Sequence, residues 1–177
     1  MGKLTTTCFI TLDNVIEEPH RWSGAYFSDE TGNLNDAVLR ESDAMVLGRD
    51  TYEGFAAAWP QRSGEPFSDK LNAMPKYVVS TTLETADWNN TTILDADPFA
   101  RIRELKAEQN VLTWGSAQLV RGMLAEGLVD ELLLLYSPIV LGAGKRLFGE
   151  GARHDLEVVE ARPLEGGMLA LRLAAAR

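Results

Sequence analysis

Two short stretches of the sequence place a glycine and a polar residue directly after an apolar run. In "MVLGRDTYEGF" these residues are Gly48, Arg49 and Thr51, and in "VLTWGSAQLV" they are Gly115 and Ser116. If a helix follows each run, its unpaired N–H groups and the positive end of its dipole attract phosphate. Glycine lets the backbone approach an anion closely, and an arginine can hold a phosphate through two N–H groups. Two such junctions predict a site for a dinucleotide with a separate phosphate, such as NADPH.

The same junctions have a plainer interpretation. Strand–glycine–helix turns are common in α/β folds, so both glycines can be turn residues and Arg49 a solvated or salt-bridged charge. Neither stretch is a GxGxxG dinucleotide fingerprint or a Walker A loop. A further glycine-rich stretch, "LGAGKRLF" at 141–148, lacks the Ser or Thr that follows the lysine of a phosphate-binding loop. We expect this stretch to form a loop against the substrate side or a turn.

A reaction that uses a hydride from NADPH also needs a proton. A carboxyl group with a raised pKa, or a water molecule that it positions, is the usual source. The candidate groups between residues 13 and 36 are Asp13, Glu17, Glu18, His20, Asp29, Glu30 and Asp36. A carboxylate in a polar loop is usually solvated surface, and this alternative stays open for each of them. We select Asp13 and Glu30 as the catalytic candidates.

Hydrophobic periodicity predicts the elements that position these residues. The predicted strands are 4–12, 44–47, 76–80, 91–95, 110–114 and 130–136, and 156–162 and 168–175 form an antiparallel hairpin. The predicted helices are 33–43, 51–59, 98–108 and 116–127, the last with Ser116 as N-cap and Gly127 as its stop. Residues 13–28 are expected to be a polar loop. Alternating strands and helices followed by a hairpin predict one three-layer α/β domain over 1–177, with a mixed central sheet.

Composition excludes several classes of function. The 177 residues carry a formal net charge of -9, which repels a nucleic-acid backbone. The single cysteine, Cys8, lies in an apolar run and is expected to be buried, and His20 and His154 lack metal-ligand spacing. The longest apolar stretch, 131–142, is too short to span a membrane, and it fits a core or an interface equally well. We expect a cytoplasmic protein without a metal, membrane or nucleic-acid partner.

Five stretches in order resemble the RibD C-terminal family of riboflavin-biosynthesis reductases, which has a dihydrofolate-reductase-like fold. They are "TLDNVI" (11–16), "LGRDTYEGF" with Trp59, "MPKYVVS" (74–80), "GSAQLVRGMLAEGLVDEL" (115–132) and "PIVLGAGKRLF" (138–148). The resemblance spans nearly the whole chain. It implies an NADPH-dependent reductase that acts on a small heterocyclic molecule and is usually a homodimer.

The resemblance also implies roles for individual residues. Gly48, Arg49 and Thr51 would hold the adenosine-side phosphates of NADPH, and Ser80 and Thr81 would flank the adenosine. The pyrophosphate near the nicotinamide would lie against Gly115, Ser116, Ala117 and Gln118. On the substrate side the resemblance places Asp13, with Asp29 or Glu30 as the analogue of the dihydrofolate reductase acid. Apart from the resemblance, we expect Trp22 in the 13–28 loop to contact the substrate as part of a lid.

The chain departs from the riboflavin reductases where the substrate binds. Asn14 replaces the glycine of their "SLDG", Thr7 replaces a lysine, and Trp114-Gly115-Ser116 replaces Glu-Gly-Gly. Trp114 is expected to present a flat apolar surface to an aromatic or heterocyclic ring. The sequence also has no H-x-E or P-C-x-x-C motif of the companion zinc deaminase.

Three functions therefore compete. The first is a reductase of a small heterocycle such as a pterin or pyrimidine. The second is a folate-type reductase or a riboflavin-pathway reductase of 5-amino-6-(5-phosphoribosylamino)uracil. The third is an NADP-binding protein without turnover.

Overall fold

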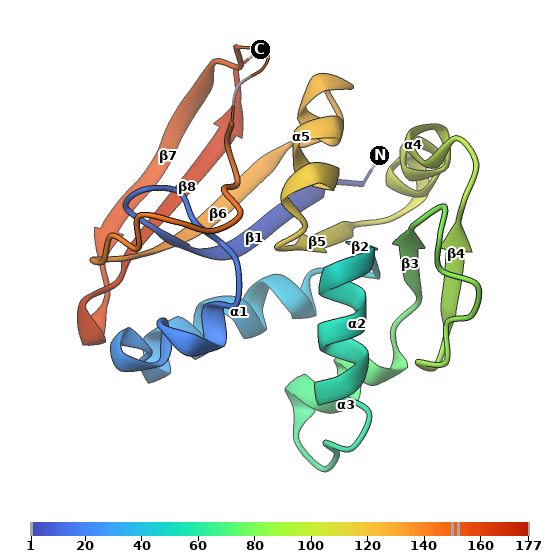
Figure 1. The fold of residues 1–177 in the computed structure, drawn as a ribbon, viewed down its shortest axis with the longest axis horizontal. Coiled ribbons are helices and arrows are strands. Elements are labelled where there is room, and N and C mark those ends of the chain that lie inside the picture. Colours follow the sequence, from blue (N-terminus) through green and yellow to red (C-terminus); the bar gives the residue numbers. More distant parts are fainter. Residues whose placement is uncertain (1, 150, 152, 177) are drawn as a thin grey trace.

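A mixed β-sheet forms the centre of the computed structural model, which describes residues 2–149, 151 and 153–176. In this part of the chain the sheet has eight strands in the order β4-β3-β2-β5-β1-β6-β8-β7 (Figure 1). They are β1 (Leu4–Thr11), β2 (Ala44–Gly48), β3 (Lys76–Val79), β4 (Thr91–Leu94), β5 (Val111–Trp114), β6 (Glu131–Ser137), β7 (Leu156–Pro163) and β8 (Leu169–Ala175). The strands β1 to β6 run parallel to one another. The strand β8 is antiparallel to both of its neighbours, β6 and β7, so the predicted mixed sheet and hairpin are confirmed.

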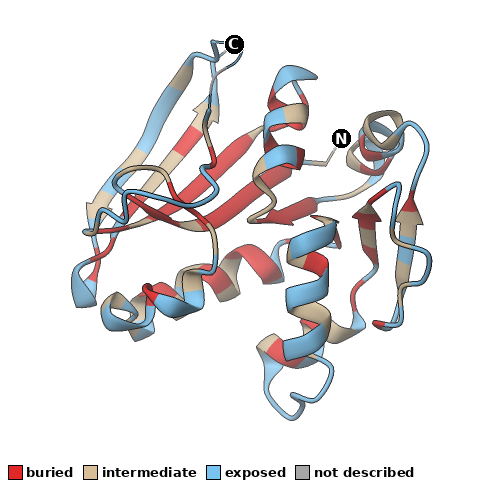
Figure 2. Cartoon of the chain, in the orientation of Figure 1, coloured by how far each residue is buried: buried red, intermediate tan, exposed pale blue. Residues whose placement is uncertain are grey.

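Helices cover both faces of the sheet and complete three layers. One face carries α1 (Asp29–Arg40), α2 (Arg49–Ala58) and α3 (Pro66–Ala73), and the other carries α4 (Pro98–Glu108) and α5 (Ala117–Ala125). Alternate side chains of each strand enter the two cores, and the buried residues follow the middle of the sheet (Figure 2). The three-layer α/β prediction is therefore confirmed.

The apolar stretch 131–142 belongs partly to the core and partly to the surface. Leu132, Leu133, Leu134 and Leu135 are at most 1% exposed, because β6 lies between β1 and β8 and under helices. Beyond the strand, Val140 is 65% exposed and Leu141 is 40% exposed. The strand residues are thus core, and only the loop that follows them offers apolar surface.

Two helices differ from the sequence-based prediction. The helix α1 begins at Asp29 instead of residue 33, because the Ser28 hydroxyl accepts the N–H of Thr31 (3.3 Å) and caps the first turn. The helix α3 was not predicted, since only Phe67 and Leu71 mark its apolar face. Short 3₁₀ turns at Pro19–Arg21 and Gly24–Tyr26 interrupt the expected loop.

The described residues also bear on metal and membrane binding. They contain no group of three His, Cys, Asp or Glu side chains that could hold a metal ion. In the same residues, no helix combines the length and the apolar character that crossing a bilayer requires. Cys8 is buried as predicted, and burial raises the pKa of its thiol to about 12.

Candidate functional site

The two strand–glycine–helix junctions meet at one edge of the sheet. The strands β2 and β5 are parallel neighbours, so their carboxyl ends lie side by side. The Gly48 N–H donates to Ser116 Oγ at 2.9 Å. The hydrogen of that hydroxyl has two acceptors at 3.0 Å, Thr51 Oγ1 and the Trp114 carbonyl. The structure therefore brings together residues that the sequence separates, and we call this group of Gly48, Thr51, Gly115 and Ser116 the cradle.

The two glycines of the cradle face the opposite turn at van der Waals distance. Gly115 has a φ of +56°, a left-handed conformation that favours glycine, and a Cβ there would lie 3.4 Å from Thr51 Oγ1. At Gly48 a Cβ would lie 3.5 Å from the side chain of Ser116. The backbone conformation thus favours glycine at 115, and a side chain at either position would contact the opposite turn.

Both helices that start at the cradle lack a side-chain cap. Ser116 precedes α5 as predicted, but its hydroxyl bonds to the Gly48 N–H and not to an N–H of α5, since its φ of 59° turns it away from the helix. The expectation that the Ser116 side chain caps α5 is therefore wrong. Gly48 gives α2 no side-chain cap either. Two uncapped helix N-termini side by side fit a phosphorylated ligand.

The turn after β3 is a third part of the candidate site. Arg49 donates to Thr82 Oγ1 (2.6 Å) and to Glu53 Oε1 (2.8 Å), so this turn contacts the start of α2. Ser80 is buried, and its hydroxyl accepts the N–H groups of Thr82 (3.2 Å) and Leu83 (3.0 Å). The neighbouring Thr81 is exposed. Sequence reasoning missed Thr82, although the Ser-Thr-Thr run after a strand is a signal for such a turn.

The first residues of α5 complete the predicted cofactor set. Ala117 is half-buried and Gln118 is exposed, and both lie in the first turn of the helix next to Ser116. Their backbone N–H groups belong to the uncapped N-terminus.

Asp13 does not have the environment of a proton donor. Its Oδ1 accepts from the Thr11 hydroxyl (2.6 Å) and the Leu141 N–H (3.2 Å), and its Oδ2 accepts from the Gly142 N–H (2.8 Å). The Thr11 hydroxyl and these N–H groups lower the pKa of Asp13 to about 2. The carboxylate stays ionised at neutral pH, so it stores no proton itself, and a catalytic role of Asp13 through a water molecule that it positions stays a prediction. Asp13 instead fixes the loop after β6 to the loop after β1.

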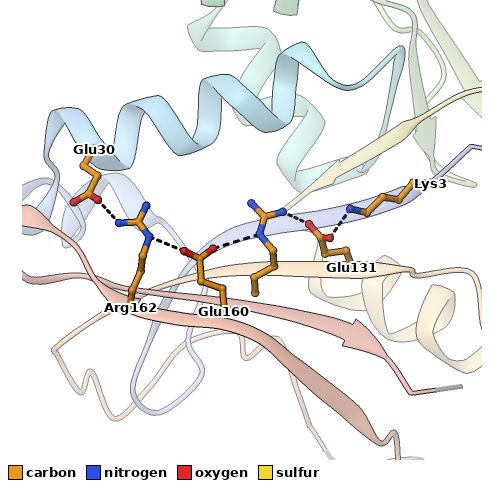
Figure 3. A network of polar contacts seen from close by, with 6 residues as sticks. Lys3, Glu30, Glu131, Glu160 and Arg162 are labelled. Carbon is orange, nitrogen blue, oxygen red and sulfur yellow. Dashed lines mark hydrogen bonds and ion pairs between the residues drawn. The ribbon is translucent and has the colours of Figure 1, made fainter.

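The Glu30 carboxylate also has partners within the protein. Its carboxylate accepts the Glu165 N–H (3.0 Å) and pairs with Arg162, and these contacts lower its pKa. The pair begins a chain of opposite charges that crosses β7, β8 and β6 (Figure 3). We call it the ladder, and its members are Glu30, Arg162, Glu160, Arg172, Glu131 and Lys3. Glu30 therefore joins α1 to the C-terminal hairpin and holds no proton for a substrate.

The other acid candidates are mostly engaged as well. Glu18 pairs with Arg21 at 3.0 Å and Asp36 pairs with Arg40 at 3.1 Å. Glu17 accepts a backbone N–H from the loop after β6 (3.2 Å). His20 and Asp29 are exposed. The structure thus gives none of these groups a distinctive place at the cradle.

The two tryptophans expected to contact the substrate lie in different surroundings. Trp114 is only 9% exposed, and its ring packs 6.0 Å from Phe55 and 6.1 Å from Phe67. The indole is therefore largely covered by α2 and α3, and its contact with a substrate ring stays a prediction. The Trp22 indole donates to the Glu17 carbonyl (3.0 Å) and lines a hollow of about 240 Å³ next to Leu141.

Thr7 and Trp114 are direct neighbours across β1 and β5. They are the positions at which the riboflavin reductases are expected to carry a lysine and a glutamate. In this chain the pair is uncharged, and Thr7 Oγ1 is buried without a hydrogen-bond partner in the described part of the chain. A buried hydroxyl without a partner is costly unless a ligand or water satisfies it.

Comparison with known proteins agrees with this architecture. Residues 2–170 match the family model of the RibD C-terminal domain. Among curated proteins, the chain is 27% identical over 168 residues to YyaP of Bacillus subtilis, a protein described as uncharacterized, covering 90% of this chain and 88% of the relative.

Solved structures show the same fold at lower identity. A candidate riboflavin biosynthesis protein from Shewanella sp. PV-4 superposes with a TM-score of 0.78 at 21% identity, covering 99% of both chains. A diaminohydroxyphosphoribosylaminopyrimidine deaminase/5-amino-6-(5-phosphoribosylamino)uracil reductase from Thermotoga maritima has a TM-score of 0.68 at 14% identity. That match covers 99% of this chain and 57% of the larger protein.

Proposed function

The chain belongs to the RibD C-terminal domain family, and from this membership we propose that it is an NADPH-dependent reductase of a small heterocyclic substrate. The observation that carries the proposal is the Ser116 hydroxyl, which joins two uncapped helix N-termini into one cradle. The likeness to a 5-amino-6-(5-phosphoribosylamino)uracil reductase supports reductase chemistry. We further propose that residues 1–177 act as one domain, in a cytoplasmic homodimer.

The cofactor proposal assigns the phosphates to the cradle and its neighbours. Gly115, Ser116 and the first turn of α5 would hold the pyrophosphate near the nicotinamide through backbone N–H and hydroxyl groups, and Gly48 and Thr51 would hold the adenosine-side phosphates together with Arg49. Arg49 would grip the 2'-phosphate of the adenosine half, exchanging its present contact with Thr82 for charge-assisted bonds. Ser80 and Thr81 would flank the adenosine. When bound, the reduced nicotinamide would supply the hydride.

The substrate proposal rests on the loss of two charges at once. A lysine and a glutamate side by side would suit the polar phosphoribosyl-aminopyrimidine, and here Thr7 and Trp114 occupy neighbouring positions on β1 and β5. An uncharged pair favours a less polar heterocycle such as a pterin or a pyrimidine without the sugar phosphate. The free Thr7 hydroxyl would hydrogen-bond to this ring, and the aromatic side chains around Trp114 would form an apolar wall.

The two carboxylates selected from the sequence, Asp13 and Glu30, hold parts of the fold in place and do not store a proton for the substrate. Asp13 and Glu30 remain ionised at neutral pH because their hydrogen bonds lower both pKa values. We propose that water supplies the proton and that the loop fixed by Asp13 limits access of bulk solvent. The same lack of a stored proton favours the third function, nucleotide binding without turnover, as the alternative.

Titration of the purified protein with NADPH and NADH tests the cofactor proposal. We expect Arg49→Ala to weaken NADPH binding about 10-fold to 100-fold and NADH binding little, because only NADPH carries the 2'-phosphate. Arg153→Ala is the matched control, since Arg153 is an exposed arginine that pairs with the nearby, exposed Asp155. Equal losses for both nucleotides would contradict the role of Arg49.

Turnover separates the reductase from the binding protein. Oxidation of NADPH is followed optically across a panel of pterins, pyrimidines and the phosphoribosyl-aminopyrimidine. Turnover of an uncharged heterocycle supports the proposal. Turnover of the phosphoribosyl compound alone would contradict it and indicate a reductase of the riboflavin pathway. Tight NADPH binding without any turnover would establish the alternative.

A further inference from the structure

The loop after β6 carries a lysine that reaches the start of α2. Lys145 lies in the stretch 141–148, which the sequence assigned only to a loop or turn, and its ammonium group pairs with the carboxylate of Asp50. Asp50 is the second residue of α2, between Arg49 and Thr51. The Lys145 side chain therefore extends from the loop after β6 and contacts the helix that begins at the cradle.

The backbone of Lys145 is held by several contacts, whereas its side chain is exposed. The Lys145 carbonyl accepts the Ile16 N–H (2.9 Å), and the Lys145 N–H donates to Glu17 Oε2 (3.2 Å). An antiparallel bridge between Val15 and Arg146 fixes the next residue. The Lys145 side chain itself is 61% exposed. An exposed ammonium group on a fixed backbone can change its ion-pair partner without a rearrangement of the fold.

The present partner of Lys145 is easily replaced. The Asp50 side chain is 74% exposed, and ion pairs between exposed groups contribute little to stability. A carboxylate in the first turn of a helix occupies the region of positive potential that also attracts phosphate. A pyrophosphate held at the neighbouring cradle carries more negative charge than Asp50 and competes for the same ammonium group.

Arg49 and Lys145 approach the cradle from opposite sides. Arg49 contacts Thr82 in the turn after β3, and Lys145 comes from the loop after β6. In the sheet order, β3 lies on one side of the β2–β5 pair and β6 on the other.

Two further cationic side chains, Arg146 and Arg121, lie close to Lys145, beside the carboxylates of Asp50 and Glu17. Arg146 follows it directly, and the Arg121 guanidinium on α5 donates to the Arg146 carbonyl (3.3 Å). The chain as a whole has a formal net charge of -9. These cations are available to an anionic ligand only where it displaces the carboxylates that they now face.

We propose that Lys145 binds the pyrophosphate of the nicotinamide cofactor, leaving Asp50 when the cofactor binds. The proposal rests on the proposed function and adds a binding residue from a loop outside the two helix junctions. It also explains why an exposed aspartate stands at a site for phosphate: Asp50 holds the lysine side chain near the cradle in the free protein. NADPH and NADH both carry the pyrophosphate, so Lys145 serves both nucleotides equally.

The test compares Lys145→Gln with Arg153→Gln, which removes one positive charge from another exposed ion pair. Binding of NADPH and NADH is measured by calorimetric titration, with thermal unfolding as the check of folding. We expect Lys145→Gln to weaken both nucleotides about 10-fold and Arg153→Gln to leave both unchanged. Equal affinity of Lys145→Gln and the wild type would overturn the proposal, and a loss confined to NADPH would overturn the assignment to the pyrophosphate.

A second variant tests the exchange of partners. Asp50→Asn keeps the shape of the side chain but removes the competing carboxylate, so we expect NADPH to bind about 3-fold more tightly at low salt. Weaker binding by Asp50→Asn would contradict the exchange. If the wild type binds neither nucleotide, the proposed function itself fails, which is distinct from failure of the Lys145 proposal alone.

Discussion

The ladder and the cradle use polar groups on the same sheet for different purposes. In the ladder each charge faces an opposite charge, and these contacts lower the pKa of Glu30 and raise that of Arg162 (Figure 3). In the cradle the polar groups are backbone N–H groups and hydroxyls at two uncapped helices. Charges that satisfy one another hold the structure together, while uncapped N–H groups remain available for a ligand. If this is correct, the two regions respond differently to substitution.

Removal of the most buried carboxylate of the ladder should give the largest effect. Glu131 is 8% exposed and is paired with both Lys3 and Arg172. Glu131→Ala should lower the free energy of unfolding by about 3 kcal/mol, because it leaves a largely buried guanidinium without its nearest partner. Urea unfolding measures this loss, and NADPH affinity should not change.

The control for this variant is Glu157→Ala, an exposed glutamate on β7. It should change the free energy of unfolding little. A comparable loss in both variants, or a loss of NADPH affinity in Glu131→Ala, would remove the distinction between ladder and cradle.

Gly115→Val should have the next largest effect, this time on binding. The new side chain would crowd Thr51 and occupy the face of the turn, so NADPH affinity should fall about 100-fold, equivalent to about 2.7 kcal/mol. Gly127→Val is the matched control, because Gly127 also has a positive φ (+63°) but no atom within 4 Å of its added Cβ. The control should share the conformational strain and retain NADPH binding. Equal binding losses would show that strain, and not the cradle, is responsible.

Ser116→Ala should have a moderate effect on both properties. It removes the acceptor of the Gly48 N–H, which should lower the free energy of unfolding by about 1 kcal/mol and NADPH affinity about 5-fold. Ser68→Ala on α3 removes a comparable serine hydrogen bond, to the Glu65 carbonyl at 3.0 Å. That control should affect stability alone. Unchanged NADPH affinity in Ser116→Ala would argue against a hydroxyl link between the two helices.

The smallest predicted effect is a pH dependence that arises from Asp13. Hydrogen bonds in the folded protein lower its pKa from 3.8 to about 2. Its contribution to stability is therefore fully present above pH 3.8 and is lost as the pH falls through 2. Acid unfolding of Asp13→Asn should lack this part of the pH dependence, whereas the exposed Asp87→Asn should follow the wild type. Identical curves for Asp13→Asn and the wild type would contradict the hydrogen-bonded clamp.

Local sequence signals predicted most of the fold. Pro98 at a helix start and an apolar face at Ile102 and Leu105 placed α4 at the residues observed. The helix α3 has no clear sequence signal, because its eight residues include few apolar positions and resemble a loop. This helix matters for the site, because Phe67 of α3 packs against Trp114 and helps to bury it.

The site was predicted in part, for a physical reason. Glycine and serine after a strand indicate a turn that can hold phosphate, so the residues of the cradle were identifiable from their types. Their partners were not, because Gly48 and Ser116 are 68 positions apart and only the strand order joins them. Glu30 and Arg162 are 132 positions apart, so the pairing that disqualifies Glu30 as an acid has no local signal.

Hydrogen exchange of backbone amides with and without NADPH tests the central claim most directly. The account predicts slower exchange at two separate segments, 48–51 and 115–118, and no change along the strands of the ladder. Protection of both segments at once would show that one ligand occupies the joined helix N-termini. Unchanged exchange at both segments under saturating NADPH, or protection confined to the ladder, would contradict the cradle as the cofactor site.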